Sequence, residues 1–188
     1  FAAAFGSTDI TAERIAFAIA AYERTLISDQ TPWDAYNGGD VTALTPQERN
    51  GMAIFFGPGQ CDVCHTAPLF SDGTFRNLGL RPVTEDEGRF EVTGNPGDRG
   101  RFKTPTLRNA GLRSRFMHQG EFATLQQVNA FYNAGGGPHA LNRSPVLNLI
   151  NVPPGAPQAD LAAFVGNALT DPRVAQGLPP FDRPTLFS

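Results

Sequence analysis

The sequence has few cysteines, no basic excess and no long apolar run, and each shortage removes a class of protein. Its 188 residues include two cysteines, so no second cysteine pair is available to complete a structural zinc site. The formal net charge is −3, which argues against nucleic acid as a partner because phosphate neutralisation needs a basic excess. No apolar run reaches the roughly 18 residues that span a bilayer, so we expect no membrane span.

Glycine and proline, by contrast, are abundant. The chain has 20 glycines and 16 prolines, and 40% of its residues are hydrophobic. No segment has a strand pattern long enough to predict a sheet, whereas several segments have helical spacing. A chain of this length supports one domain, or one domain with an appended element. We therefore expect an all-α domain whose long irregular loops wrap around a buried group.

The motif Cys61-Asp62-Val63-Cys64-His65 indicates what that group is. Its spacing is that of a c-type haem attachment site, in which two thiols bond the haem vinyl groups and the adjacent imidazole binds iron. The alternatives each lack a part. Only His118 and His139 could complete a zinc site, without a recognisable spacing. A thioredoxin-like pair needs a βαβ context, and a disulfide between Cys61 and Cys64 would close a small, strained loop.

Four segments are predicted to be helical. Residues 8–28 carry apolar side chains on one face at helical spacing. Capping-box signatures at Thr45 and Thr124 open the second and third helices, and the third is expected to end near Asn133. A last helix is expected over about residues 158–169. The chain between the second and third helices has turn residues and scattered apolar anchors, which is typical of loops packed around a cofactor.

Several further motifs occur in a fixed order along the chain. They lie at residues 9–26, 33–36, 102–109, 116–120, 131–136, 169–173 and 180–184. Together with the haem motif, they resemble the C-terminal half of bacterial di-haem cytochrome c peroxidases, and particularly of their MauG-like relatives. The resemblance covers almost the whole chain.

This resemblance implies an architecture of two haem domains. Residues 41–188 are expected to form the C-terminal c-type haem domain. Residues 1–40 are expected to form a linker helix that packs on an N-terminal haem domain missing from this sequence. That domain, on the same polypeptide or on a partner chain, would carry a second haem c and the peroxide site of the family. Trp33 lies in the linker and does not take the role of the family's inter-haem tryptophan.

Two functions of different classes stay open on the sequence. The resemblance implies a haem-dependent oxidoreductase that uses hydrogen peroxide, with this chain as the electron-transferring half of a peroxidase or of a MauG-like protein-modifying oxidase. The partners would then be an electron-donor protein or a protein substrate. The alternative is a stand-alone mono-haem electron-transfer cytochrome c. Both imply the periplasm, because haem is attached covalently outside the bacterial cytoplasm.

The second axial ligand of the iron follows from the family register. In that register, the ligand lies fourteen residues after the histidine of a His-Asp-Gly motif, which here reads His118-Gln119-Gly120. Tyr132 stands at this position, as a tyrosine does in MauG, and it shares a helix face with Leu125 and Val128. Met117 is the alternative ligand and would give an ordinary high-potential haem. A half-buried Tyr132 without iron is the purely structural interpretation.

Other polar residues are assigned from the same register. His118 matches a family histidine that lies near the haem without binding iron, and both a structural and a direct functional role stay open for it. Lys103 and Arg108 are predicted to pair with the haem propionates, since buried carboxylates need cationic partners. Arg113 and Arg115 stand where the family binds an inter-domain calcium ion through backbone oxygens, and these two added cations argue against calcium here.

Overall fold

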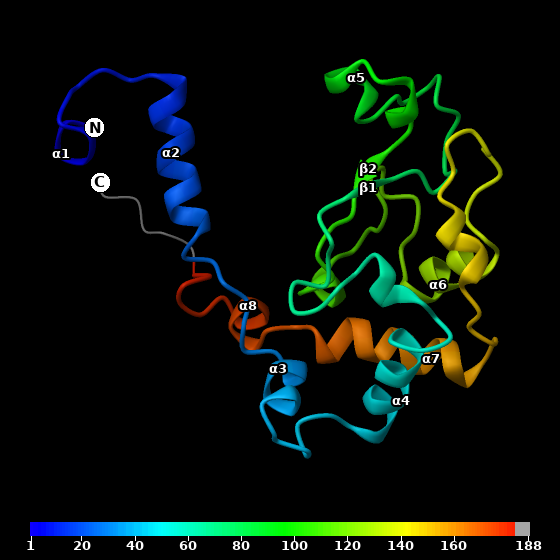
Figure 1. Ribbon diagram of the computed structural model, residues 1–188. Coiled ribbons are helices and arrows are strands. Elements are labelled where there is room, and N and C mark those ends of the chain that lie inside the picture. Colours follow the sequence, from blue (N-terminus) through cyan, green and yellow to red (C-terminus); the bar gives the residue numbers. More distant parts are fainter. Residues whose placement is uncertain (183–188) are drawn as a thin grey trace.

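The computed structural model describes residues 1–182 and has a helical fold with very little strand (Figure 1). Arg183 and Pro184, at the end of the last predicted motif, lie outside the described residues. The elements are, in chain order, α1 (Ala2–Phe5), α2 (Ala12–Glu23), α3 (Pro32–Asn37), α4 (Pro46–Phe55), η1 (Cys61–Val63), β1 (Phe75–Arg76), α5 (Phe90–Thr93), η2 (Pro96–Asp98), β2 (Phe102–Lys103), η3 (Ala110–Leu112), α6 (Leu125–Asn133), η4 (Pro145–Leu149), α7 (Ala156–Ala163), η5 (Phe164–Ala168) and α8 (Pro172–Gln176).

Three of the helices begin with a capping box that has threonine at the N-cap position. Thr31, Thr45 and Thr124 each accept a hydrogen bond from the backbone N–H three residues later, and the side chain at that third position accepts one from the threonine N–H. These capping boxes satisfy two N–H groups that the first turn of a helix leaves unpaired. The predicted starts at Thr45 and Thr124 are confirmed, and Thr31 adds a third that opens the short helix α3.

The core forms where α4 packs against α7. The two backbones approach so closely that a Cβ on Gly51 would lie 2.0 Å from the backbone oxygen of Asp160, so only glycine fits at this contact. Phe55, Phe70 and Phe164 are fully buried beside it, with ring centroids 5.3 to 6.3 Å apart and the rings steeply tilted. Such edge-to-face pairs add about 0.5–1.5 kcal/mol each to the burial of the rings.

The N-terminal helices lie apart from this core (Figure 1). The predicted helix over residues 8–28 is present but shorter, because Thr11 caps its start and the chain leaves helical geometry after Glu23. No residue of α1 or α2 is buried, and Ile15 and Ile19 on the predicted face are 43% and 53% exposed. The apolar face predicted for this helix is therefore uncovered within the described residues.

Two departures from the sequence predictions are small. β1 and β2 form a two-residue antiparallel ribbon, which no local pattern predicted. The last helix starts slightly earlier than expected and continues through η5, a π-helical turn that ends before Leu169. None of the helices within residues 1–182 is long and apolar enough to cross a membrane.

Candidate functional site

The predicted haem-attachment motif forms a single tight turn. Its centre is η1, and the His65 amide donates to the Cys61 carbonyl at 2.8 Å. Gly59 allows the chain to enter this turn, because an added Cβ would lie 2.7 Å from a backbone oxygen of α4. The turn brings Cys61, Cys64 and His65 to the wall of one cavity.

This cavity has a volume of about 610 Å³, which is within the range of cofactor sites. It lies between the haem motif, the loop before β2, η3, α6, η4 and the α7–η5 helix. Its walls are largely apolar and come from distant parts of the sequence, including Phe55, Leu107, Leu125, Val128, Leu147 and Val165. Loops and helices together enclose this space, and its occupation by a macrocycle stays a prediction.

The hydrogen bonds of His65 fix which of its nitrogens is free. Its Nδ1 lies 3.0 Å from the carbonyl oxygen of Phe70 and 3.1 Å from that of Pro105. A carbonyl only accepts, so Nδ1 carries the proton and Nε2 keeps its lone pair. Burial lowers the pKa of His65, which keeps the ring neutral at pH 7. Histidines that bind metals are commonly held in this way.

The environment of the two thiols favours their protonated, unreactive form. Burial raises the pKa of Cys61 to about 12, and the neighbouring Asp62 and Cys64 add to this rise. Burial also raises the pKa of Cys64. A redox pair needs a thiolate, which this environment disfavours. A thioether bonded to haem carries no charge, so it is compatible with this burial.

Tyr132 lines the same cavity from the apolar face of α6, together with Leu125 and Val128. Burial raises the pKa of its phenol well above the ordinary value. Among the described residues, its hydroxyl has no hydrogen-bond partner. The oxygen is therefore available to a group inside the cavity.

The His-Gln-Gly motif lies at another part of the cavity wall. Met117, the alternative distal ligand, lines the cavity in a left-handed conformation with φ 67°. The ring of His118 stacks on Phe102 with 3.7 Å between centroids, and its Nε2 lies 3.5 Å from a carboxylate oxygen of Asp86. Gln119 donates to the same oxygen at 2.9 Å. The structure brings both predicted distal ligands to the cavity, and it gives His118 partners that sequence reasoning missed.

Cationic side chains also border the cavity. Lys103, a predicted propionate partner, lines it from β2, and Arg113 and Arg115 line it from the segment after η3. Within residues 1–182, no ion pair engages these three side chains. Sequence reasoning chose Lys103 and Arg108 over Arg113 and Arg115 as carboxylate partners, but all four side chains border the cavity.

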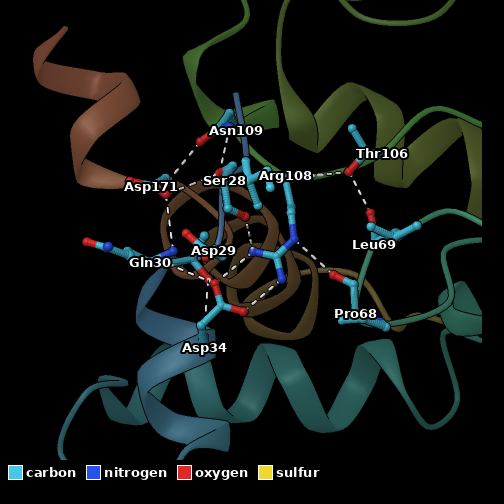
Figure 2. Close-up of polar contacts among 12 residues, drawn as sticks. Ser28, Asp29, Gln30, Asp34, Pro68, Leu69, Thr106, Arg108, Asn109 and Asp171 are labelled. Atoms are coloured by element: carbon cyan, nitrogen blue, oxygen red, sulfur yellow. Dashed lines mark hydrogen bonds and ion pairs between the residues drawn. The ribbon is translucent and has the colours of Figure 1, made fainter. Parts of the chain in front are cut away.

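Arg108 has partners other than the predicted one. Its guanidinium makes two 2.7 Å bonds to the carboxylate of Asp34 on α3, and it also donates to the carbonyls of Ser28 and Pro68 at 2.7 and 2.9 Å (Figure 2). This fork-to-carboxylate pairing uses the geometry that a propionate would need. Arg108 also lines the cavity, so its Asp34 contact is an additional partner and its pairing with a haem propionate stays a prediction.

Metal-binding side chains are otherwise scattered. Within residues 1–182, no group of three or more His, Cys, Asp or Glu side chains is placed to hold a metal ion. A haem iron needs no such cluster, because the macrocycle supplies most of its ligands. A calcium ion held by backbone oxygens would not need such a cluster either. The expectation that calcium is not bound here therefore stays a prediction.

Comparison with known proteins gives a consistent set of relatives. A family model described as di-haem cytochrome c peroxidase matches residues 1–42. The cytochrome-c peroxidase IdrP1 of Denitromonas iodatirespirans is 36% identical over an alignment of 192 residues, gaps included. This alignment covers 84% of this chain and 50% of that protein. The methylamine utilization protein MauG of Methylorubrum extorquens is 34% identical over 138 residues, covering 72% of this chain and 39% of that protein.

A solved structure extends the similarity to the fold. The crystal structure of a MauG-like protein associated with microbial copper homeostasis matches with a TM-score of 0.81 and 31% identity, covering 97% of this chain and 60% of that chain. The chain thus spans about half or less of the length of the two curated relatives described above. With the motif order, the helical fold and the cavity beside the Cys-x-x-Cys-His turn, these matches lead to one conclusion. The chain belongs to the di-haem cytochrome c peroxidase and MauG family.

Proposed function

We propose that this chain is the electron-transferring haem domain of a di-haem oxidoreductase that uses hydrogen peroxide, as a peroxidase or as a MauG-like oxidase of a protein substrate. A second haem domain, on the same polypeptide or on a partner chain, would provide the peroxide site. The length of the relatives supports this division, since the chain covers half or less of each of the two curated ones described above.

The hydrogen bonding of His65 carries this proposal. Its Nδ1 proton is held by two backbone carbonyls, which leaves the Nε2 lone pair free beside Cys61 and Cys64 at an apolar cavity. Cys61 and Cys64 would hold a haem c through thioethers, and His65 would be its proximal ligand. Such a cofactor supplies one-electron redox chemistry, and the protein supplies its orientation and its electrostatic environment.

Tyr132 is the proposed distal ligand. Its phenol faces the cavity without a hydrogen-bond partner among residues 1–182, and burial alone keeps it protonated. A nearby metal cation reverses such a pKa shift by stabilising the phenolate. An anionic ligand favours ferric iron and lowers the reduction potential, which fits the MauG-like branch. Ligation by Met117 would instead raise the potential and favour the peroxidase branch or simple electron transfer.

The exposed face of α2 supports a partner domain. Ile15, Ile19 and Tyr22 share one face of this helix at helical spacing, and each is more than 40% exposed. Exposed apolar groups of this kind mark contact surfaces, and a second haem domain is the partner that the family provides. A stand-alone mono-haem carrier would leave this face in water. We place the protein in the periplasm, where haem is attached covalently to such motifs.

Haem stoichiometry tests the proposal. The pyridine haemochrome of the purified native protein, measured against protein mass, should give two haems per functional unit, one of them on this domain. One haem per functional unit would transfer the function to the mono-haem carrier. A haem that acid acetone extracts from this domain would overturn the proposed attachment through Cys61 and Cys64.

A further inference from the structure

The two carbonyls that accept the His65 proton belong to two separate loop segments. Phe70 ends the loop that follows the haem motif, and Pro105 lies 35 residues later, after β2. Neither segment has regular secondary structure, so other contacts must hold the carbonyls at their 3.0 and 3.1 Å distances from Nδ1. The strength of this hydrogen bond sets the basicity of the imidazole, which in turn tunes the metal that it binds.

A short ladder of hydrogen bonds joins the two segments. The Leu107 amide donates to the Phe70 carbonyl at 3.2 Å, and the Thr106 hydroxyl donates to the Leu69 carbonyl at 2.5 Å. The third rung is the bond from Arg108 Nε to the Pro68 carbonyl at 2.9 Å (Figure 2). Arg108 is therefore the end of a ladder whose first rung shares the Phe70 oxygen with His65.

The rest of the Arg108 guanidinium is held by the linker. It binds both carboxylate oxygens of Asp34 and the carbonyl of Ser28, and Figure 2 shows it between these groups and Pro68. The linker also touches the ladder through Trp33, whose ring meets the Phe70 ring edge-on at 4.8 Å. One short helix, α3, thus contacts the ladder by an ion pair and by an aromatic pair.

The ion pair is largely shielded from water. The Arg108 side chain is 10% exposed and that of Asp34 is 21% exposed. Burial acts to raise the pKa of Asp34, but hydrogen bonds from Arg108 and Thr31 outweigh it, and the pKa lies below the ordinary value. Removal of one charge from a shielded pair leaves the other without a partner, which is costly. The pair is therefore a firm attachment rather than a mobile surface contact.

We propose that Arg108 and Asp34 are positioning residues for the proximal imidazole, through which the linker helix α3 holds the His65 acceptors in place and sets the reduction potential of the haem. This inference rests on the proposed function, because it takes His65 as the iron ligand. It adds a role for the linker, which connects α2 to the haem domain. A firm Nδ1 bond gives the imidazole more anionic character and favours ferric iron, so loosening it raises the potential.

Two conservative variants of the full-length protein test this role. Asp34→Asn keeps the shape of the side chain but removes its charge, and Arg108→Lys keeps the charge but cannot form the two-pronged contact or reach Pro68 at once. Both should raise the midpoint potential of this haem in a spectroelectrochemical titration. Both should also speed hydrogen exchange of the Leu107 amide, a readout that does not depend on activity. Asp34→Glu, which keeps the charge, should return the potential towards that of the parent.

Asp29→Asn is the matched control. Asp29 lies in the same linker as Asp34 and pairs with Arg173 at 2.7 Å. Its side chain is exposed and does not contact the ladder. This variant should leave the potential and the Leu107 exchange rate unchanged. Unchanged potentials in Asp34→Asn and Arg108→Lys, with only a lower Tm, would overturn the positioning role and leave the proposed haem attachment standing. Absence of covalent haem from the parent protein would instead contradict the proposed function itself. If Arg108→Lys does not fold, the Asp34 pair of variants decides the question.

Discussion

The N-terminal helices and the cavity-bearing region differ in what covers their apolar side chains. Phe55 on α4 and Phe164 at the start of η5 are fully buried by residues of this chain, whereas Phe17 and Ile19 on α2 are more than half exposed. Both regions contain amphipathic helices with good caps, so local sequence does not separate them. The difference indicates that the cavity-bearing region builds its own core, whereas α2 buries none of its apolar side chains within the described residues.

The largest expected effect is at the haem-attachment turn. Cys61→Ala combined with Cys64→Ala removes both thioether bonds, so covalently bound haem should fall to background in a haem-stained denaturing gel. His139→Ala, which changes a histidine outside the cavity wall, is the control and should keep its haem. Retention of covalent haem by the double variant would show that attachment occurs elsewhere.

The comparison between the two regions can be measured directly with one substitution type. Phe164→Ala removes a fully buried ring and should lower the free energy of unfolding by about 3–5 kcal/mol. Phe17→Ala removes an exposed ring and should change it by less than about 0.5 kcal/mol in this domain. Urea unfolding followed by circular dichroism gives both values. Equal losses would mean that α2 belongs to the same core.

Tyr132→Phe should alter the haem more than the fold. Loss of the phenol oxygen removes the proposed anionic ligand, so the ferric absorption spectrum should change and the midpoint potential should rise, while stability changes by about 1 kcal/mol or less. Met117→Leu is the matched variant at the alternative ligand and should leave the spectrum unchanged. The reverse pattern would assign the distal position to Met117.

The sequence predicted the features that depend on neighbouring residues. The haem motif, the capping boxes at Thr45 and Thr124, and the existence of α2 are local patterns, and the structure has a cavity, two helix starts and a helix at those places. Thr31 carries the same local signature as Thr45, with Asp34 in the third position, and it could have been recognised from the sequence.

Long-range pairs were beyond such reasoning. Arg108 and Asp34 are 74 residues apart, and nothing local distinguishes a guanidinium that meets a linker carboxylate from one that meets a haem propionate. His118 and Asp86 are a similar case, since the acidic run around Asp86 has the composition of a solvated loop. Tyr132 and Met117 are a third case, since only the fold shows that both line one cavity.

A smaller effect is expected at Asp171, in the junction between the two regions. This fully buried carboxylate accepts bonds from Arg173 and from the Gln30 amide. Burial acts to raise its pKa, but these bonds outweigh it, and the folded-state pKa lies below that of the unfolded chain. Its stabilisation is therefore present above about pH 4, the ordinary range of aspartate, and is lost as the pH falls through the folded value.

Asp171→Asn isolates this contribution. It should lower the free energy of unfolding by about 1 kcal/mol at pH 7 and by less at about pH 3, where the carboxylate of the unfolded chain is already largely protonated. Denaturant titrations of parent and variant at the two pH values measure the difference. A loss that does not depend on pH would mean that Asp171 acts through shape rather than charge.

Peptide mass mapping tests the central claim most directly. Trypsin cleaves after Arg49 and Arg76 with no lysine or arginine between them, so one peptide contains Cys61, Cys64 and His65. We expect this peptide, from protein purified from the periplasm, to carry the added mass of one haem and to absorb in the Soret region. A peptide with two free cysteines, or with a disulfide between them, would contradict the assignment of this domain as a c-type haem domain.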